Sequence, residues 1–520
     1  MSARQHEPRT LIAFAFAALV VCSIPVFGMR FLNDMAFYSL FADKLLAGGV
    51  LYRDAMDTKP PLVFVHYALV FKVFGLNNAA AVKVVTMVWL AASALIMVAL
   101  RRALSPRAAV PVPHAMAAFL FVLASFSGWG QDFLSSNTEI LANLFILAGV
   151  WFLAARDMGR RPLHLVAGGA CIGIACLYRY QSGAALLAYL ATMLLRHRQF
   201  DRKLARVLLV GAGCLLPVAV FVIYYARIGA LDDLRLFLAY QRHYTQDADD
   251  FYWPEVLGQL GKTVAGLWPL LLLAGWQAAE IARKRAAATR QEIFQLTFAV
   301  LSASTFFLGG RLFPHYFVQA IPALVLLAAD RLEIARADPP ARRARWRAWF
   351  EAHALAIMVA AASVFTAING AYFWTRKDDP PRRDLIAFVE AQSQPSDQVL
   401  LWTWRPELLV QTGRTFATRQ LVNGPLIGLP YRRRPGQRRS GVPGLWPIYL
   451  RDLAAAPPKL IFDAPPGRSE WPIERFPQLA PVLANYRPCQ IVDEVCVYVR
   501  KADARKSDPR NKPDATPLTP

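Results

Sequence analysis

Eleven apolar runs separated by short basic tracts constrain this chain more than any other feature of its sequence. Hydrophobic residues make up 56% of its 520 residues and charged residues only 18%, so the apolar surface far exceeds what one soluble core would bury. About 20 apolar residues in a helix cross a hydrocarbon layer of ~30 Å. The sequence therefore predicts a mainly α-helical, polytopic membrane bundle with about eleven spans. The runs are residues 11–29, 79–100, 109–127, 137–155, 163–180, 182–196, 205–226, 263–282, 292–308, 314–330 and 351–374.

The sequence has a net charge of +22, and its basic residues lie in short tracts between the apolar runs. With eleven spans, every basic tract falls on the side of the N-terminus, which is the distribution that the positive-inside rule produces. This placement argues against a nucleic-acid partner and predicts a cytoplasmic N-terminus. The tracts are residues 4–9, 101–107, 156–161, 196–206, 283–290 and 331–347.

Residues 60–75 form an apolar stretch that is short for a span. The stretch opens with two prolines and carries His66 and Lys72. Counting it as a span would move every later basic tract to the outer face. We therefore expect an interfacial or re-entrant helix on the outer side, with membrane lipids as its neighbours.

The composition changes after Trp374 to a Pro-rich, charged and mixed sequence. We expect a membrane domain at residues 1–374 with an outer loop at 30–78, and a small C-terminal α/β domain at 375–502. The last residues, 503–520, are predicted to be a disordered tail. Within the α/β domain we expect helices at 383–392 and 446–455 and strands at 398–403 and 459–463.

Two of the six cysteines, Cys489 and Cys496, flank what looks like a closing hairpin in this domain. An outer compartment would permit a disulfide between them. Two unpaired buried thiols are the alternative that the sequence leaves open.

Charged residues crowd into residues 33–62, directly behind the first apolar run. Asp34, Asp57 and Lys59 are the most informative, because a carboxylate and an ammonium on one loop can have separate roles. The carboxylate can accept a proton from a hydroxyl, and the ammonium can neutralise a phosphate. Charge held against lipid is costly and suggests function. A solvated loop whose charges keep it out of the membrane is the alternative.

Further polar side chains are expected at the same outer face. Arg179 is basic on the side that carries few basic residues, so it could meet a phosphate, or it could snorkel from a helix end. His315 could orient a substrate, bind a metal or donate to a backbone carbonyl. The sequence contains no zinc spacing, P-loop, dinucleotide fingerprint or nucleophile-elbow motif. The other candidates are Glu139, Gln181, Arg311 and Tyr316.

The pattern of Asp34, Ala36 and Tyr38, followed by residues 49–54 and 59–62, resembles the GT-C glycosyltransferases that use polyprenyl-phosphate sugars. It is most like the bacterial group that includes lipid A aminoarabinose transferases, rhizobial lipopolysaccharide galacturonosyltransferases and relatives of protein mannosyltransferases. Residues 137–139, 177–183 and 313–316 are also similar to this family, so the likeness covers most of residues 10–330. Met35 and Thr58 stand where acidic residues are common in it.

The resemblance implies a function and roles for these residues. A sugar would move from a polyprenyl-phosphate donor to a hydroxyl of an envelope glycan, lipid or protein, by inverting displacement in a bacterial inner membrane, with the C-terminal domain periplasmic. Asp34 would be the catalytic base, and Lys59 and Arg179 would bind the donor phosphate. Supporting roles fall to Tyr52, Asp57, Glu139, Gln181, Arg311, His315 and Tyr316. A divalent metal at Asp57 with His66 or His315 is left open, because Met35 and Thr58 depart from the family pattern.

Two other classes of function remain open at this stage. A lipid-linked-sugar flippase would use the same charges to bind and release a phosphate, although transporters usually show internal repeats and this sequence shows no clear one. A scaffold would instead use the basic run at residues 431–439 to attract anionic lipopolysaccharide or an acidic partner. A solvated loop is the alternative interpretation of this run.

Overall fold

The computed structural model describes residues 3–31, 33–104, 112–159, 161–196, 200–246, 253–308, 312–337, 345–375, 382–428, 441–469 and 471–501. The chain divides into two compact units. The membrane unit comprises Met1–Arg30 and Thr58–Arg376, and the α/β unit comprises Phe31–Asp57 and Lys377–Pro520. Residues 31–57, expected as part of the membrane domain's outer loop, therefore group with the C-terminal residues. The predicted tail and the basic run at 431–439 lie outside the described residues.

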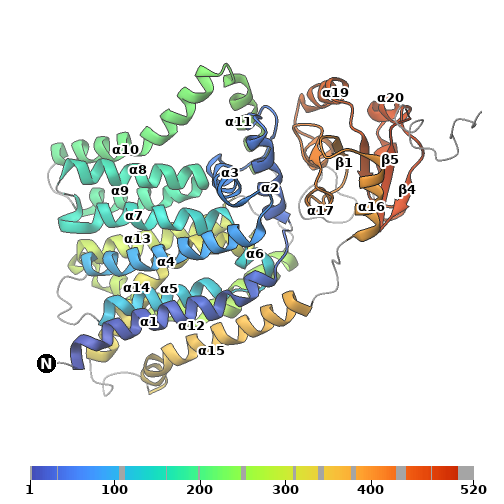
Figure 1. Ribbon diagram of the computed structural model, residues 1–520. Helices are drawn as coiled ribbons and strands as arrows, with labels where there is room; N and C mark the ends of the chain where they lie inside the picture. The colour runs from blue at the N-terminus through green and yellow to red at the C-terminus, as the bar shows by residue number, and fades with distance from the viewer. Residues whose placement is uncertain are drawn as a thin grey trace, which may run out of the picture. The chain divides into compact units, whose positions relative to one another are not determined.

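The membrane unit is built from helices, and each of the eleven predicted runs overlaps at least one of them (Figure 1). By length and composition, five helices in the described part of the chain could cross a membrane, and five shorter helices are also apolar. The predicted helical membrane bundle is thereby confirmed. Its α-helices are α1 (Ala3–Gly28), α3 (Leu62–Phe74), α4 (Ala79–Leu104), α5 (Val112–Phe126), α6 (Gly130–Leu134), α7 (Thr138–Gly159), α8 (Pro162–Tyr178), α9 (Gly183–Arg196), α10 (Phe200–Arg227), α11 (Leu231–Gln246), α12 (Trp253–Lys284), α13 (Arg290–Ser304), α14 (Ile321–Ala337) and α15 (Arg345–Thr375). Short 3₁₀ turns include η1 (Tyr180–Ser182) and η5 (Pro314–Ala320).

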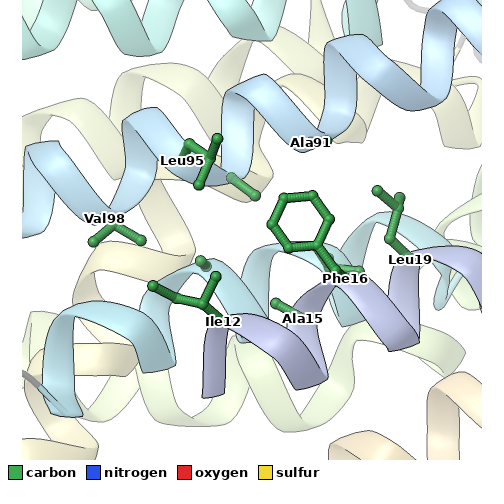
Figure 2. A pocket seen from close by; sticks show the side chains of 10 residues that line it. Ile12, Ala15, Phe16, Leu19, Ala91, Leu95 and Val98 are labelled. Carbon is green, nitrogen blue, oxygen red and sulfur yellow. The ribbon is translucent and has the colours of Figure 1, made fainter. Parts of the chain in front are cut away.

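Large apolar side chains cover the outside of this bundle, as expected of a surface in contact with lipid. Val20 and Ile24 of α1 are more than half exposed, as are Leu208 and Leu215 of α10. Inside the bundle, small residues allow close helix contacts. Figure 2 shows the seam between α1 and α4, where Ala15 and Ala91 lie among larger side chains. The free volume there is only about 10 Å³, so the seam is close-packed.

Helix α3 occupies the short apolar stretch at residues 60–75. Its 13 residues rise about 20 Å, less than the ~30 Å of a hydrocarbon layer. Val65, Leu69 and Val73 are exposed along one face, while Phe64 and Tyr67 are buried. An interfacial or re-entrant placement of α3 remains our prediction.

Lys83, a buried lysine near the start of α4, stabilises the end of the first helix. Its ammonium donates hydrogen bonds to the backbone carbonyls of Phe27 (3.3 Å) and Met29. A cation at a helix C-terminus is favourable and satisfies carbonyls that have no partner within the helix.

We expect Lys83→Met to lower the stability of the folded protein by ~1–3 kcal/mol, because the carbonyls lose a charged donor. The measurement is the thermal unfolding midpoint of the purified full-length protein in detergent. The exposed Lys262 of α12 provides the control Lys262→Met. Equal midpoints for the two variants would show that Lys83 does not cap α1.

The α/β unit contains a five-stranded sheet of order β2-β1-β3-β5-β4. Strand β1 pairs in parallel with β2 and β3, and β5 pairs antiparallel with β3 and β4. The predicted small α/β domain is confirmed, and its two predicted helices and two predicted strands are present. The strands are β1 (Gln398–Leu401), β2 (Thr415–Phe416), β3 (Leu460–Asp463), β4 (Gln490–Val492) and β5 (Val495–Val499). The helices are α2 (Asn33–Leu46), α16 (Arg383–Gln392), α17 (Glu407–Thr412), α18 (Gly424–Ile427), α19 (Leu445–Ala455) and α20 (Ala480–Leu483). A disulfide joins Cys489 to Cys496 across the β4–β5 hairpin.

Aromatic contacts fix α2 to the C-terminal part of this unit. Phe41 stacks on Phe416 with ring centroids 5.4 Å apart, and Phe37 lies 5.9 Å from Trp404. Lys44 donates a hydrogen bond of 3.0 Å to the carbonyl of Phe416. These contacts explain why a segment near the N-terminus folds with residues more than 350 positions later.

Asp463, at the end of β3, is a buried carboxyl group outside the membrane bundle. Burial raises its pKa from 3.8 to about 7, although the backbone N–H groups of Ala464 and Ile473 donate to it and act in the opposite direction. Because the folded-state pKa lies above the unfolded value, the group's contribution to stability is complete below pH 3.8 and is lost as the pH rises through about 7.

We therefore expect unfolding of the α/β unit, followed by tryptophan fluorescence of the full-length protein, to become easier as the pH rises from about 4 to about 7. Asp463→Asn should flatten this dependence, because the amide cannot titrate. An unchanged pH dependence in the variant would assign the effect to other groups.

Candidate functional site

Three of the singled-out sequence motifs meet in one buried polar cluster of the membrane unit. Glu139 lies in the first turn of α7, Arg179 directly follows α8, and His315 and Tyr316 belong to η5. Glu139, Arg179 and His315 are 1%, 6% and 6% exposed. Because α7 packs on both α8 and η5, motifs far apart in the sequence become neighbours.

Glu139 is the centre of this cluster. Its Oε1 atom accepts a hydrogen bond from Nη1 of Arg179 and lies 3.9 Å from Nε2 of His315. Its Oε2 atom accepts from the hydroxyl of Thr138 at 3.0 Å. A buried carboxylate is costly unless it is paired in this way.

One edge of the Arg179 guanidinium group has no hydrogen-bond partner among the described residues. The group lies 4.1 Å from the centroid of the Tyr316 ring, a cation–π contact. Its Nε and Nη2 atoms are buried and have no hydrogen-bond partner among the described residues. These two nitrogens form the side-on fork that binds carboxylate or phosphate bidentately. Burial at 6% exposure also argues against the snorkelling interpretation of Arg179.

A second group of polar and aromatic side chains lies beside Arg179. The hydroxyl of Tyr178 and Nδ1 of His66 are 3.4 Å apart, and the His66 ring lies edge-on to Trp89 at 5.2 Å. Tyr67 of α3 donates a hydrogen bond of 3.0 Å to the carbonyl of Ser136, just before α7. Helix α3 is therefore held against the helices that carry Glu139 and Arg179.

Three candidates from the charged segment belong to the α/β unit. Asp34 lies in the first turn of α2, is half-buried, and accepts a hydrogen bond of 3.4 Å from Tyr38. Tyr52 is buried with a positive φ of 66°, and its N–H donates to the carbonyl of Ala55. Asp57 is half-buried at the end of this segment.

Lys59 belongs to the membrane unit, because the division falls between Asp57 and Thr58. Lys59 is half-buried, and so is Gln181 in η1, two residues beyond Arg179. Arg311 lies outside the described residues. In the described part of the chain, no group of three or more His, Cys, Asp or Glu side chains could hold a metal ion.

The sequence analysis missed two buried features of the membrane unit. Lys83 was hidden within an apolar run, and the only signal was one lysine near its start. Arg101 was counted as part of a basic tract, but it is buried and paired with Asp330 and Glu333 of α14. Acidic residues at the end of an apolar run were the available signal for this pairing.

Residues 58–225 match the family model described as dolichyl-phosphate-mannose-protein mannosyltransferase. The matched segment lies within the membrane unit and contains Lys59, Glu139 and Arg179. No curated protein matches the chain.

Solved structures share the fold of nearly the whole chain. ArnT from Cupriavidus metallidurans bound to undecaprenyl phosphate has a TM-score of 0.60 at 14% identity, and the match covers 94% of this chain and 97% of that chain. The apo state of the same protein has a TM-score of 0.58 at 15% identity, with the same coverage. The apo oligosaccharyltransferase of Archaeoglobus fulgidus has a TM-score of 0.52 at 13% identity, covering 88% of this chain and 69% of that chain. The chain thus has the GT-C glycosyltransferase fold, as its motifs predicted.

Proposed function

We propose that this chain is an integral membrane glycosyltransferase that moves a sugar from a polyprenyl-phosphate donor to a hydroxyl group of a cell-envelope acceptor. The observation that carries the proposal is the buried Arg179, whose Nε and Nη2 atoms have no partner among the described residues. The family match to residues 58–225 and the GT-C fold support the same activity.

The donor phosphate is assigned to the Nε–Nη2 edge of Arg179, which has no hydrogen-bond partner among the described residues. Glu139 holds the opposite part of the guanidinium group, and Tyr316 lies against its face, so the fork is held in a fixed orientation. As the sugar leaves, negative charge grows on the phosphate, and the attraction of fixed positive charge grows with it. Lys59 is proposed to bind the same phosphate, on the basis of the sequence resemblance.

The transfer step is a direct displacement at the anomeric carbon. The bond from this carbon to the phosphate oxygen breaks, and its electron pair leaves with the polyprenyl phosphate. A bond to the acceptor oxygen forms, the acceptor proton passes to the carboxylate of Asp34, and the anomeric centre is inverted. The role of Asp34 comes from the family resemblance, and Tyr38 donates to this carboxylate.

The proposed class of sugar donor and the proposed membrane location are based on the similar solved structures. One relative is described as ArnT bound to undecaprenyl phosphate, and another as AglB in complex with a dolichol-phosphate. For this chain we propose a polyprenyl-phosphate sugar in a bacterial inner membrane, with the α/β unit periplasmic. The proposed acceptor is a hydroxyl of lipopolysaccharide or lipid A, of another glycolipid, or of a protein.

A transfer assay in proteoliposomes tests this function. Full-length protein is incubated with polyprenyl-phosphate pentoses and hexoses, labelled in the sugar, and with lipid A, envelope glycolipids and envelope proteins as acceptors. We expect label in one acceptor class, together with release of unglycosylated polyprenyl phosphate. Movement of intact donor between leaflets without release would identify a flippase instead.

A further inference from the structure

A cavity of about 290 Å³ lies between the end of α14 and the beginning of α15. It is separate from the Arg179 cluster, because η5 precedes α14 and the cavity lies at the other end of that helix, about 20 Å of helix away. This end of the membrane unit also carries the start of α1 (Figure 1). The lining residues are Leu332, Ala335 and Arg336 from α14, and Ala348, Glu351, Ala352 and Leu355 from α15.

Positive charge is in excess at this cavity. Glu351 is 6% exposed, and its Oε1 atom accepts hydrogen bonds from Nε of Arg331 at 2.6 Å and from Nε of Arg347 at 3.1 Å. Arg336 adds a third guanidinium group in the wall and is exposed. Two guanidinium groups thus contact Glu351, and that of Arg336 is a third positive charge in the cavity wall.

The two acidic residues of α14 reduce this excess but do not cancel it, because Arg101 of α4 balances one of their two charges. Asp330 and Glu333 each lie 2.5 Å from Nη2 of Arg101 on α4. The last turns of α14 therefore separate the charges, with carboxylates toward α4 and guanidinium groups toward α15.

Exposed tryptophans indicate the level of the cavity in the bilayer. Trp346 and Trp349, at the start of α15, are 60% and 58% exposed, and Trp346 lies 5.3 Å from Trp276 of α12. Exposed tryptophans at helix ends are typical of the headgroup level of a bilayer. We therefore place the cavity near the headgroup level. Part of its wall is apolar and is formed by Leu332 and Leu355.

We infer that this cavity binds the phosphate group of an anionic phospholipid, in the leaflet on the side of the N-terminus. Basic pockets between membrane helices on that side are suited to phosphate headgroups, and the apolar wall accommodates the start of the acyl chains. The bound lipid would bridge α14 and α15. This inference does not depend on the proposed sugar transfer.

Native mass spectrometry of the full-length protein in detergent tests the inference, with phosphatidylglycerol, phosphatidylcholine and inorganic phosphate as separate probes. We expect retention of phosphatidylglycerol over phosphatidylcholine. Arg336→Gln should weaken phosphatidylglycerol binding about fivefold, which corresponds to the ~1 kcal/mol of one basic residue near a membrane surface. Ala352→Trp should also weaken it, because the indole fills the cavity and leaves every charge in place.

Arg283→Gln is the matched control, since Arg283 is an exposed arginine at the C-terminal end of α12 with a side chain that is 72% exposed. This variant should bind phosphatidylglycerol as the wild type does. Equal retention of the two lipids, or equal losses in the Arg336 and Arg283 variants, would overturn the inference. Displacement of phosphatidylglycerol by inorganic phosphate would show a general anion site and would overturn the assignment to a lipid.

Discussion

Arg179→Gln is expected to lower kcat/KM for sugar transfer by ~10²–10³-fold, the usual effect of removing one fixed donor from a developing oxyanion. The reason is the geometry of the guanidinium group. Glu139 and Tyr316 hold Arg179 in place, so its Nε–Nη2 edge needs no reorganisation as charge grows on the leaving phosphate. The measurement is the initial rate of transfer from a labelled polyprenyl-phosphate sugar.

The single variant leaves Glu139 buried without its cation, which can cost ~3–5 kcal/mol of stability. The double variant Glu139→Gln/Arg179→Gln removes both charges and should regain the wild-type thermal midpoint, while its transfer rate stays as low as that of Arg179→Gln. Arg227→Gln, at an exposed arginine of α10, is the control and should transfer at the wild-type rate. Wild-type transfer by the double variant would remove Arg179 from the mechanism.

Asp34→Asn is expected to lower kcat by ~10²–10⁴-fold, the usual contribution of a positioned general base. The amide keeps the shape of the side chain but cannot take a proton from the acceptor hydroxyl. Donor binding should be retained, because the phosphate is assigned to Arg179 and Lys59. The measurements are the turnover rate at saturating acceptor and the Kd of the donor, both with full-length protein.

Asp384→Asn is the matched control for Asp34. Asp384 also lies in the first turn of a helix of the α/β unit, α16, and it is exposed. This variant should keep the wild-type turnover rate. Wild-type turnover by Asp34→Asn would contradict the role of Asp34 as the base, whatever the outcome for Arg179.

Local patterns in the sequence were sufficient to predict most of the secondary structure. The apolar runs predicted the helices of the bundle because a helix needs about 20 consecutive apolar residues to cross the hydrocarbon layer. Helix α16 and strand β3 were predicted close to their observed bounds because their patterns are local as well. The grouping of α2 with the α/β unit could not be predicted, since it depends on contacts such as Phe41 with Phe416, which are far apart in the sequence.

The same limit applies to the candidate site. Glu139, Arg179 and His315 were each predicted as candidates, but no local pattern indicated that one carboxylate oxygen of Glu139 would lie close to both Arg179 and His315. Nor could the sequence show that Arg101 is buried rather than part of a solvated basic tract, because the pairing with Asp330 and Glu333 joins α4 to α14. Pairings between distant segments depend on packing, which the linear sequence does not display.

The most direct test of the central claim is the distance from the phosphate of a bound donor to the guanidinium group of Arg179, measured in a structure of the full-length protein with a polyprenyl-phosphate sugar. We predict that Nε and Nη2 each lie within ~2.7–2.9 Å of a phosphate oxygen, the range of charge-assisted hydrogen bonds, while Nη1 keeps its contact with Glu139. A donor phosphate bound elsewhere, with the Nε–Nη2 edge of Arg179 not in contact with it, would contradict the account.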